Sequence, residues 1–500
     1  MTMIQPISAT DRLAPLRRFA GQPMTTGLGD PLINQFASSD SCLLRAIDHA
    51  VDYANHMASR YPSLMDLDEQ QQIEQIQQGF LNFYQSDAVT PYVAAGAAGP
   101  WIITLKGAVL YDTGGYGMLG LGHAPETILQ AINAPHVMAN IMTPNLSQMA
   151  LIDALRQEVG HNREQGCPYH SFLCMNSGSE SVSVAARISD VNAKQMTDKG
   201  ARHAGKPIMR VALKGAFHGR TDRPAQYSDS SMATYKKYLA SFQGEPRLIT
   251  VEANNCEQLK VVFEAANAEN WFIESMFFEP VMGEGNPGLA ITPAFYALAR
   301  QLTEEHGALL LADSIQAGLR TTGNLSITDY PGFEKLPAPD METYSKALNG
   351  GQYPLSVLAL SSKAHKLYQK GLYGNTMTTN PRAMDVAVAV LDAITPNLRK
   401  NIVATGNALV EKFSALMNEL GGAITKVQGT GLLVSIELSE SYKCFGANSI
   451  ENYLRTQGIN VIHGGTNSLR FTPWFNISDN EIDLLVNATK DALLNGPRKT

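Results

Sequence analysis

HGALLLADSIQAG, residues 306–318, and ETYSKALNGGQYPL, residues 342–355, are the two segments that decide the fold. In the first, an apolar run predicts a buried strand that ends at Asp313. In the second, Lys346 precedes a glycine pair and is predicted to lie at the end of another strand. A carboxylate in the first position can hold the proton on a pyridine nitrogen, and a lysine in the second can form a Schiff base with an aldehyde. The two segments together therefore indicate a site for pyridoxal 5′-phosphate (PLP).

The composition is that of an ordinary globular protein. Of 500 residues, 44% are apolar and 17% are charged, which is enough for a large core and more than one folded region. The net charge of −7 gives no electrostatic basis for binding nucleic acid or an anionic membrane. We expect neither a bilayer-spanning segment nor a secretory signal. The five scattered cysteines form no CxxC pair, so we expect no metal site, no disulfide framework and a cytoplasmic location.

From Ser171 onward, short apolar strands alternate with helical stretches. This alternation predicts an α/β fold with a large, doubly wound, mostly parallel sheet that binds ligands at the carboxyl ends of its strands. The predicted strands are SFLCM (171–175), IMRVALK (208–214), LITVEA (248–253), MFFEPV (276–281), ALLLAD (308–313) and LSVLAL (355–360). We expect the large domain to span residues 96–395 and a smaller α+β C-terminal domain to span residues 396–500.

Residues 1–95 are predicted to form an N-terminal extension or arm and the start of the small domain. Within them, residues 66–86 are predicted to be helical, because apolar side chains recur at three- to four-residue steps: Ile73, Ile76, Phe80 and Phe83. This segment either packs on a partner subunit or covers the chain's own surface, and the sequence favours neither. Residues 101–112, WIITLKGAVLYD, predict two strands that turn at Lys106-Gly107.

A glycine-serine turn, Ser177-Gly178-Ser179, lies between the strand SFLCM and a predicted helix. Free backbone N–H groups and a hydroxyl at a helix N-terminus can bind a phosphate group. The alternative is a plain N-cap, with Ser177 or Ser179 capping the helix and Glu180 favouring its first turn. Taken alone, this motif fits the N-cap better.

Two further motifs follow predicted strands. In KGAFHGRT, residues 214–221, Phe217 is suited to stacking on a flat ring and Arg220 to clamping a carboxylate. The alternative is a core phenylalanine and a surface arginine. In EPVMGEG, Glu279 and Glu284 suggest the polar wall of a pocket, or else a solvated loop.

The segment after Asp313 supplies two candidate ring contacts. Ile315 is suited to packing on a ring face, and Gln316 to donating a hydrogen bond to a ring oxygen. An aspartate that ends a strand can instead merely cap a helix. Farther on, Arg470 lies in an otherwise apolar strand and requires a carboxylate partner, either a substrate or an acid such as Glu284.

Seven motifs occur in the order seen in class III aminotransferases, the fold type I PLP-dependent family that includes the ornithine, acetylornithine, 4-aminobutyrate and lysine ε-aminotransferases. They are NSGSE (176–180), FHGRT (217–221), EPVMGEG (279–285), ADSIQAG (312–318), TYSKAL (343–348), NTMTTNP (375–381) and LRFTP (469–473). The chain resembles this family over about residues 95–490. The resemblance implies the fold type I architecture for the large domain.

The resemblance also implies how PLP is held. Lys346 is implied to be the Schiff-base lysine and proton shuttle, and Asp313 to bind the pyridine nitrogen. Gly178 and Ser179 are implied to hold the phosphate, and we include the neighbouring Ser177 in the same turn.

Around the ring, the resemblance implies that Phe217 stacks on one face and Ile315 on the other, with Gln316 facing the ring oxygen. Thr376 is similar to the family's threonine that reaches the phosphate of the neighbouring subunit's cofactor, which implies a homodimer with shared active sites.

For the substrates, Arg470 resembles the arginine that binds the α-carboxylate of 2-oxoglutarate or glutamate. Glu284 resembles the acid that pairs with this arginine when an ω-amino substrate is present, and Arg220 the arginine that binds the far carboxylate. The implied activity is transfer of the terminal amino group of a lysine-, 4-aminobutyrate- or ornithine-like donor to 2-oxoglutarate, giving a semialdehyde and glutamate. Alternatives are a same-fold aminomutase, racemase or decarboxylase, and a catalytically silent binding protein.

The sequence departs from the family pattern at four places. They are Ser314 in place of a glutamate, Thr378-Thr379 in place of two glycines, Trp474 in place of a proline, and a longer region before residue 95. The first three affect the expected geometry of the substrate pocket, but none removes the lysine, the aspartate or the arginines.

Overall fold

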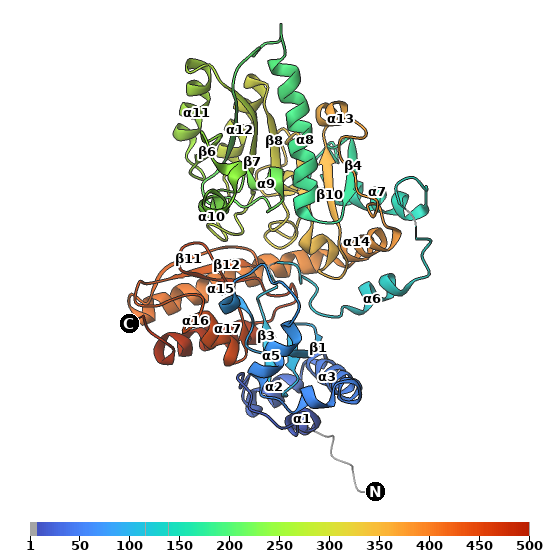
Figure 1. The fold of residues 1–500 in the computed structure, drawn as a ribbon, viewed down its shortest axis with the longest axis vertical. Helices are drawn as coiled ribbons and strands as arrows, with labels where there is room; N and C mark the ends of the chain where they lie inside the picture. The colour runs from blue at the N-terminus through green and yellow to red at the C-terminus, as the bar shows by residue number, and fades with distance from the viewer. Residues whose placement is uncertain (1–7, 116, 139, 500) are drawn as a thin grey trace.

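The computed structural model describes residues 8–115, 117–138 and 140–499, and its strands form three sheets (Figure 1). The largest sheet has seven strands in the order β4-β10-β9-β8-β7-β5-β6. Their bounds are β4 Ser171–Met175, β5 Ile208–Leu213, β6 Leu248–Val251, β7 Phe272–Phe278, β8 Leu309–Asp313, β9 Met341–Tyr344 and β10 Ser356–Leu360. The six strands predicted for this region are confirmed, and the strand expected to lead to Lys346 is β9.

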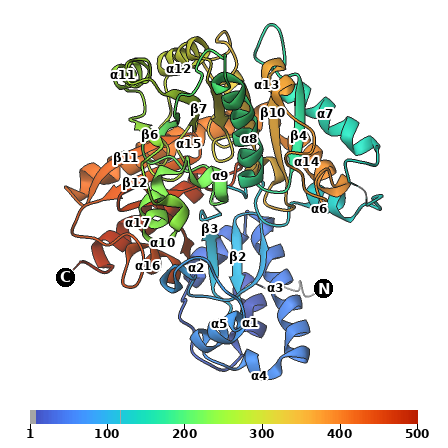
Figure 2. The same ribbon diagram turned by 45° about the horizontal axis from the view of Figure 1, so that its top comes forward.

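Five adjacent strands of this sheet, β9, β8, β7, β5 and β6, run parallel, whereas β10 pairs antiparallel with both β9 and β4. Parallel neighbours require crossover connections, and helices provide them on both faces. Helix α8 (Gly178–Thr197) packs against Leu311 on one face. Helices α11 (Cys256–Ala268) and α12 (Pro293–His306) pack against Leu310 on the other face. The predicted doubly wound, mostly parallel sheet of fold type I is therefore confirmed (Figures 1 and 2).

Shorter helical segments border this sheet or connect its strands. They are α6 Glu126–Asn133, α7 Leu146–Glu158, α9 Asp222–Ala225, η2 Asp229–Ser231, α10 Met232–Tyr238, η3 Ala240–Phe242, η4 Ile327–Asp329, η5 Lys346–Asn349 and α13 Ser362–Leu367. Of these, the 3₁₀ turns η4 and η5 follow strands β8 and β9 and border the region where the candidate site lies.

The N-terminal part of the chain combines helices with a second sheet. The helical segments are α1 Ala9–Arg17, α2 Asp30–Ala37, α3 Ser41–Arg60, α4 Pro62–Met65, α5 Glu69–Gln77 and η1 Ser86–Ala88. The sheet has the order β1-β2-β3-β13, with β1 Ala94–Ala98, β2 Trp101–Thr104, β3 Val109–Asp112 and β13 Ile459–Asn460. The predicted turn between β2 and β3 is confirmed, and Gly107 adopts φ +75° there. Because β13 belongs to the C-terminal part of the chain, both ends of the sequence share this sheet.

The helix predicted over residues 66–86 is wrong beyond Gln77. Helix α5 ends there, and Gly79 follows with φ +89°, a left-handed conformation that stops a helix. The side chains of Phe80 and Phe83, which the periodicity placed on a buried face, are 84% and 73% exposed. Apolar side chains thus continue to recur at three- to four-residue steps past Gly79, although the helix has already ended.

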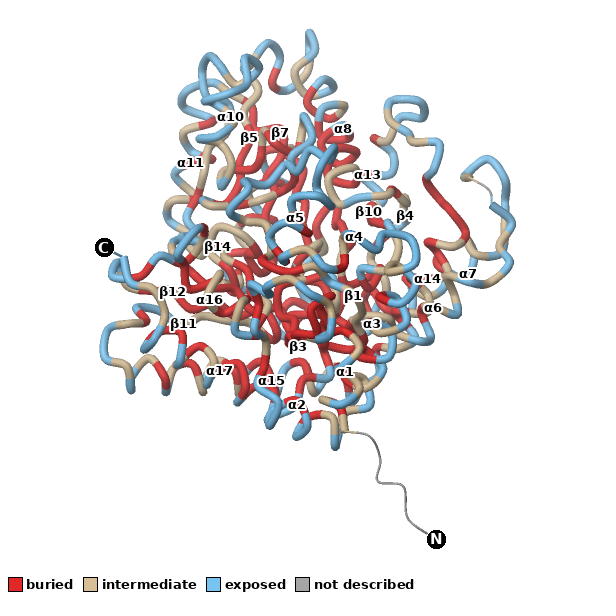
Figure 3. Tube along the Cα trace, turned by 60° about the horizontal axis from the view of Figure 1, so that its bottom comes forward, coloured by how far each residue is buried: buried red, intermediate tan, exposed pale blue. Residues whose placement is uncertain are grey.

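The C-terminal part contains a third sheet, of order β11-β12-β15-β14, covered by helices (Figure 1). Its elements are α14 Pro381–Ala393, α15 Pro396–Leu420, β11 Ile424–Thr430, β12 Leu433–Leu438, α16 Ile450–Thr456, β14 Ile462–Gly464, β15 Ser468–Phe471 and α17 Asp479–Asn495. One apolar core includes Trp101, Tyr344 and Phe471, so it joins all three sheets (Figure 3). Among the described residues, no helix is both long and apolar enough to cross a membrane.

Candidate active site

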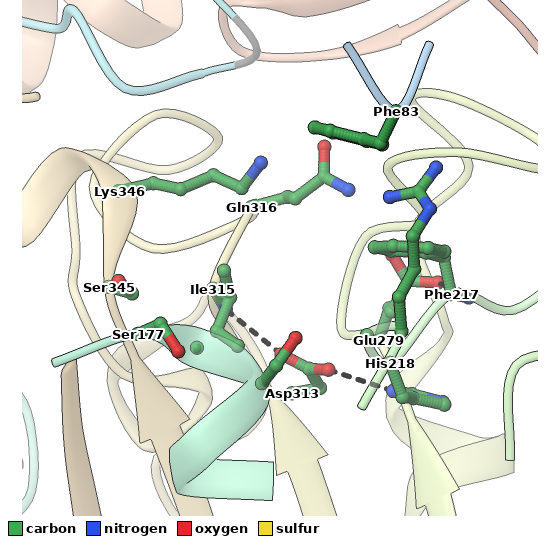
Figure 4. Close-up of a pocket in the computed structure, with 14 residues that line it drawn as sticks. Phe83, Ser177, Phe217, His218, Glu279, Asp313, Ile315, Gln316, Ser345 and Lys346 are labelled. Atoms are coloured by element: carbon green, nitrogen blue, oxygen red, sulfur yellow. Dashed lines mark hydrogen bonds and ion pairs between the residues drawn. The ribbon is translucent and has the colours of Figure 1, made fainter. Parts of the chain in front are cut away.

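A cavity of about 540 Å³ opens where strands β8 and β9 end. Because these strands are parallel neighbours, Asp313 and Lys346 reach the same edge of the sheet. The side chains that line the cavity come from widely separated segments (Figure 4). They are Phe83, Ser177, Gly178, Ser179, Phe217, His218, Gly219, Arg220, Glu279, Asp313, Ile315, Gln316, Ser345 and Lys346. Of the residues predicted to bind the cofactor, only Thr376 is outside this set.

Asp313 is the last residue of β8, and its carboxylate is buried. Its Oδ2 lies 2.8 Å from Nδ1 of His218, and its Oδ1 accepts a hydrogen bond from the backbone N–H of Ile315 at 3.3 Å (Figure 4). Both carboxylate oxygens therefore have defined partners, which fixes the orientation of the carboxylate at the cavity floor.

Lys346 is the first residue of the 3₁₀ turn η5 and has φ +46°, a left-handed conformation that is uncommon outside glycine. Its side chain extends into the cavity toward Gln316 (Figure 4). Burial lowers the pKa of Lys346 to about 8, and Arg470 acts in the same direction, while nearby carboxylates oppose both. About a tenth of the amine is therefore neutral, and nucleophilic, at pH 7, far more than for a lysine with the ordinary pKa of 10.5.

The N-terminus of helix α8 forms another wall. Ser177 is the N-cap, and its side chain accepts a hydrogen bond from the N–H of Glu180 at 3.3 Å, so the N-cap reading is correct. Two glycines, Gly178 in this turn and Gly219 in the loop after β5, lie where a side chain would clash with its neighbours. A Cβ on Gly178 would lie 2.6 Å from Cδ1 of Ile315, and a Cβ on Gly219 would lie 2.4 Å from Oγ of Ser179. The turn thus caps the helix and also lines the cavity with backbone.

Aromatic rings surround Arg220 at the cavity mouth. Its guanidinium carbon lies 4.8 Å from the ring centroid of Phe217, 5.4 Å from that of Phe83 and 5.8 Å from that of Tyr84. These distances are typical of cation–π contacts. Phe83 and Tyr84 belong to the segment after α5, so the N-terminal region supplies part of the site (Figure 4).

The buried Arg470, on β15, reaches the cavity through Gln316. Its Nη1 donates to Oε1 of Gln316 at 3.3 Å, to Oε2 of Glu284 at 3.2 Å and to the carbonyl of Gly283. Glu284 is only partly buried. The predicted alternative of a protein acid as the partner of Arg470 is therefore present in the structure, and this pair lies just behind the residues that line the cavity.

Residues 83–493 match the protein family described as "Aminotransferase class-III". The chain belongs to the class-III aminotransferases. Enzymes of this family depend on PLP.

Sequence alignments with similar proteins cover most of this aminotransferase. An acetylornithine aminotransferase from Prochlorococcus marinus is 27% identical over 394 residues, which cover 78% of this chain and 88% of that protein. An ornithine aminotransferase from Staphylococcus epidermidis is 28% identical over 407 residues, covering 80% and 93%. Among solved structures, the ornithine aminotransferase from Toxoplasma gondii ME49 has a TM-score of 0.72 at 20% identity and covers 87% of this chain and 98% of that one. This last similarity concerns the fold.

Thr376 of this aminotransferase lies on an exposed stretch outside the cavity. Its neighbour Asn375 donates a hydrogen bond to Oε1 of Glu180, on helix α8, at 2.9 Å. This position agrees with a role toward a second subunit, and that role stays a prediction.

Five residues of the cavity lining were not predicted from the sequence as site residues, namely Phe83, His218, Gly219, Glu279 and Ser345. His218 was quoted within a motif but was given no role, and Phe83 was placed on a helix face. Glu279 was expected only as part of a polar wall, but it accepts hydrogen bonds from the backbone N–H groups of Phe217 at 3.0 Å and Gly283 at 2.8 Å. Burial raises the pKa of Glu279 to about 7, and the carboxylate of Asp313 adds to this shift.

Proposed function

We propose that this aminotransferase holds PLP in the described cavity and transfers the terminal amino group of an ω-amino acid to 2-oxoglutarate, giving a semialdehyde and glutamate. The observation that carries the proposal is that Lys346 and Asp313, at the ends of adjacent parallel strands, line one cavity together with the N-terminus of α8. The names of the similar proteins, acetylornithine and ornithine aminotransferase, support a donor with a terminal amine. They favour an ornithine-like donor over the lysine- and 4-aminobutyrate-like donors that the motifs alone placed slightly ahead.

The residues of the cavity fit PLP. Gly178 and Gly219 allow close packing at the helix N-terminus, against Ile315 and Ser179 respectively, where a side chain would clash, and backbone N–H groups there favour an anion such as a phosphate group. Asp313 provides the carboxylate for a pyridinium nitrogen, and Phe217 and Ile315 are the flat and apolar contacts for a ring. Bound in this way, PLP supplies a ring that accepts electrons from the substrate carbon.

The chain's own groups then perform the proton transfers. Lys346, whose pKa is lowered to about 8, takes a proton at Nζ as a general base and returns it as a general acid. Asp313, oriented by His218, keeps a proton on the ring nitrogen.

Two arginines distinguish the substrates of the two half-reactions. In this proposal, Arg470 binds the α-carboxylate of the keto acid after it has left Glu284, and Arg220 binds the far carboxylate. An ω-amino donor carries fewer carboxylates near the reacting amine, so Arg470 stays paired with Glu284 while the donor is bound. The observed Arg470–Glu284 contact supports this paired arrangement.

We also propose a homodimer. Exposed apolar side chains gather around the start of α7 and around Thr376, namely Val137, Met138, Ile141, Met142, Leu146, Met149, Leu372 and Met377. A cavity of about 390 Å³, lined among others by Ile141 and Asn375, connects the two segments. Apolar surface of this extent marks a protein interface, and a second copy that covers it brings Thr376 toward the partner's site. A cytoplasmic location belongs to the same proposal and is supported by the scattered cysteines.

The dimer is tested by sedimentation of the wild type and of a variant with Met142→Asp and Leu146→Asp. Both side chains are about 80% exposed in the single chain, so the variant should fold and sediment as a monomer with little activity. A wild type that sediments as a monomer at micromolar concentration would contradict this part of the proposal.

The activity is tested by recording the absorbance of the purified protein while single amines, and then 2-oxoglutarate, are added. We expect the cofactor band to be lost with ornithine or a related terminal amine and to return with 2-oxoglutarate, and Lys346→Ala to abolish both changes. If the band is present but no amine converts it, an aminomutase, racemase or decarboxylase is favoured. Transamination by Lys346→Ala at a near-normal rate would refute the assigned chemistry.

A further inference from the structure

Glu342 is a fully buried carboxylate that the proposed chemistry does not use. It lies on β9, four residues before Lys346. Asp313 is paired in register with Thr343, and side chains alternate along a strand. Glu342 therefore points to the face of the sheet opposite Asp313, behind the cavity.

Five donors converge on this carboxylate. Oε1 accepts hydrogen bonds from Oγ of Ser314 at 2.5 Å and from the backbone N–H of Ile327 at 2.9 Å. Oε2 accepts from three hydroxyl groups, those of Ser326 at 2.6 Å, Tyr169 at 2.7 Å and Tyr344 at 2.9 Å.

This set of partners matches an ionised carboxylate. A backbone N–H can only donate and an ionised carboxylate can only accept, so all five contacts are satisfied when Glu342 is ionised and the four hydroxyl groups donate to it. Burial raises the pKa of Glu342, and the surrounding donors act in the opposite direction. A buried charge that is satisfied by hydroxyl groups and one N–H is costly to disturb, because each donor would lose its partner.

Three of the five donors come from the segment after Asp313, which also carries residues predicted to contact the cofactor. Ser314 follows Asp313 directly, and Ser326 and Ile327 close the loop that begins with Ile315 and Gln316. All are bound to one side chain on the strand that leads to Lys346. Glu342 thus connects the two halves of the site from behind the sheet.

We propose that Glu342 is a positioning residue. It holds Ser314 and the loop at residues 326–327 against β9. In this way it sets the position of Asp313, Ile315 and Gln316 relative to Lys346. The inference rests on the proposed function, because it assigns Glu342 a role toward the PLP that Lys346 and Asp313 would hold. It also gives Ser314, which departs from the family pattern, a specific partner.

The test uses the full-length protein and measures two properties that do not depend on turnover. These are the Kd of the cofactor-free chain for PLP, and the pH midpoint at which the absorption band of the lysine-bound cofactor titrates. We expect Glu342→Gln to weaken PLP binding about tenfold, the effect of leaving buried donors unsatisfied, and to shift the midpoint. Ser314→Ala, which keeps the carboxylate and loses one donor, should give a smaller change in the same direction.

An exchange variant, S314E together with E342S, moves the carboxylate across the 2.5 Å contact to the other strand. We expect it to recover most of the affinity lost in Glu342→Gln, as coupled neighbours do in a double-mutant cycle. The matched control is Glu274→Gln. Glu274 is likewise buried in the sheet, where it accepts a hydrogen bond from the hydroxyl of Tyr227 at 2.7 Å and pairs with Arg210 at 2.7 Å and Arg223 at 3.5 Å. None of these hydrogen bonds and ion pairs involves the segment after Asp313. This control should lower thermal stability without changing the Kd or the midpoint.

The possible results distinguish a failure of the inference about Glu342 from a failure of the proposed function. If Glu342→Gln and Ser314→Ala bind PLP as the wild type does and lose only thermal stability, as Glu274→Gln does, Glu342 is merely structural and the inference is wrong. If Glu342→Gln does not fold, Ser314→Ala and the exchange variant answer the same question. A wild type that shows no cofactor band would overturn the proposed function, and the inference with it.

Discussion

Nδ1 of His218 lies 2.8 Å from Oδ2 of Asp313, and both side chains are buried. The contact joins the loop after β5 to the end of β8, so it connects two strands at the edge where the cavity opens. A histidine that donates from Nδ1 stabilises the carboxylate and holds it in one rotamer. His218 therefore holds Asp313 in the orientation that its proposed role toward the pyridine nitrogen requires.

We expect His218→Phe to weaken the binding of PLP by the cofactor-free chain about tenfold, because Asp313 loses a charge-assisted hydrogen bond. The measurement is a titration of that chain with PLP, followed by absorbance. His306→Phe is a matched control, since His306 is also buried and hydrogen-bonded, to the N–H of Ile273, but lies outside the cavity lining. Equal PLP affinity in His218→Phe and the wild type would contradict the role of His218.

The lowered pKa of Lys346 predicts how stability depends on pH. A shift from 10.5 to about 8 means that the folded, cofactor-free chain disfavours the ammonium form, at a cost of about 3 kcal/mol. This cost is complete below pH 8, where both states hold the proton. Between pH 8 and 10.5 only the unfolded chain holds it, so this group makes the free energy of unfolding rise with pH.

Lys346→Met should therefore be more stable than the wild type at pH 7, by up to about 3 kcal/mol, with a difference that shrinks toward zero by about pH 10.5. Urea denaturation of both cofactor-free chains between pH 7 and pH 10 measures it. Lys412→Met, which removes a partly exposed lysine paired with Asp483, should show no such trend. A stability difference that does not vary with pH would exclude burial of the Lys346 charge as its cause.

Asp313 could be predicted from the sequence because it follows an apolar run, Ala308 to Ala312, that ends abruptly, and ligands bind at the carboxyl ends of such strands. The other strands predicted for this sheet were found in the same way, from short apolar runs. Lys346 has no apolar run before it, since its strand reads METY, so its prediction depended on the motifs around it.

The residues that the sequence did not reveal depend on contacts between distant segments. His218 acquires its role from Asp313, 95 positions later, and Glu342 from Tyr169 and Ser326. No local pattern marks such pairs. Phe83 was misplaced for a different reason, since helical spacing of apolar residues continues past Gly79 although the backbone turns away there.

Phe83 and Tyr84 enclose Arg220 together with Phe217, so the N-terminal segment helps to hold the guanidinium at the cavity mouth. We expect Phe83→Ala to raise the KM for 2-oxoglutarate about threefold to tenfold with a smaller change in kcat, because a less restrained Arg220 binds a carboxylate more weakly. Phe80→Ala is the control, as Phe80 is even more exposed and does not line the cavity. A change in kcat at constant KM would show that Phe83 acts on the chemical step instead.

In the proposed reaction, Glu284 competes with the carboxylate of the keto acid for Arg470. The two side chains are 3.2 Å apart, and Arg470 is fully buried whereas Glu284 is partly exposed. An incoming carboxylate must replace Glu284 at Arg470. The free energy of the Arg470–Glu284 pair is therefore subtracted from the binding free energy of the keto acid. Glu284→Gln keeps the shape and removes the charge, so it should lower the KM for 2-oxoglutarate several-fold.

The same substitution, Glu284→Gln, should be unfavourable in the donor half-reaction, because it should reduce selectivity for the terminal amine. With Arg470 no longer neutralised, an amino acid can bind by its α-carboxylate and present its α-amine in place of the terminal amine, so selectivity between the two amines should fall about tenfold. Single-turnover reactions of Glu284→Gln with ornithine and with glutamate, followed by loss of the cofactor band, measure both rates. Lys426→Met, near the same loop but bonded to Asn286, is the control. Unchanged selectivity in Glu284→Gln would mean that the Arg470–Glu284 pair is structural and that Arg220 alone distinguishes the substrates.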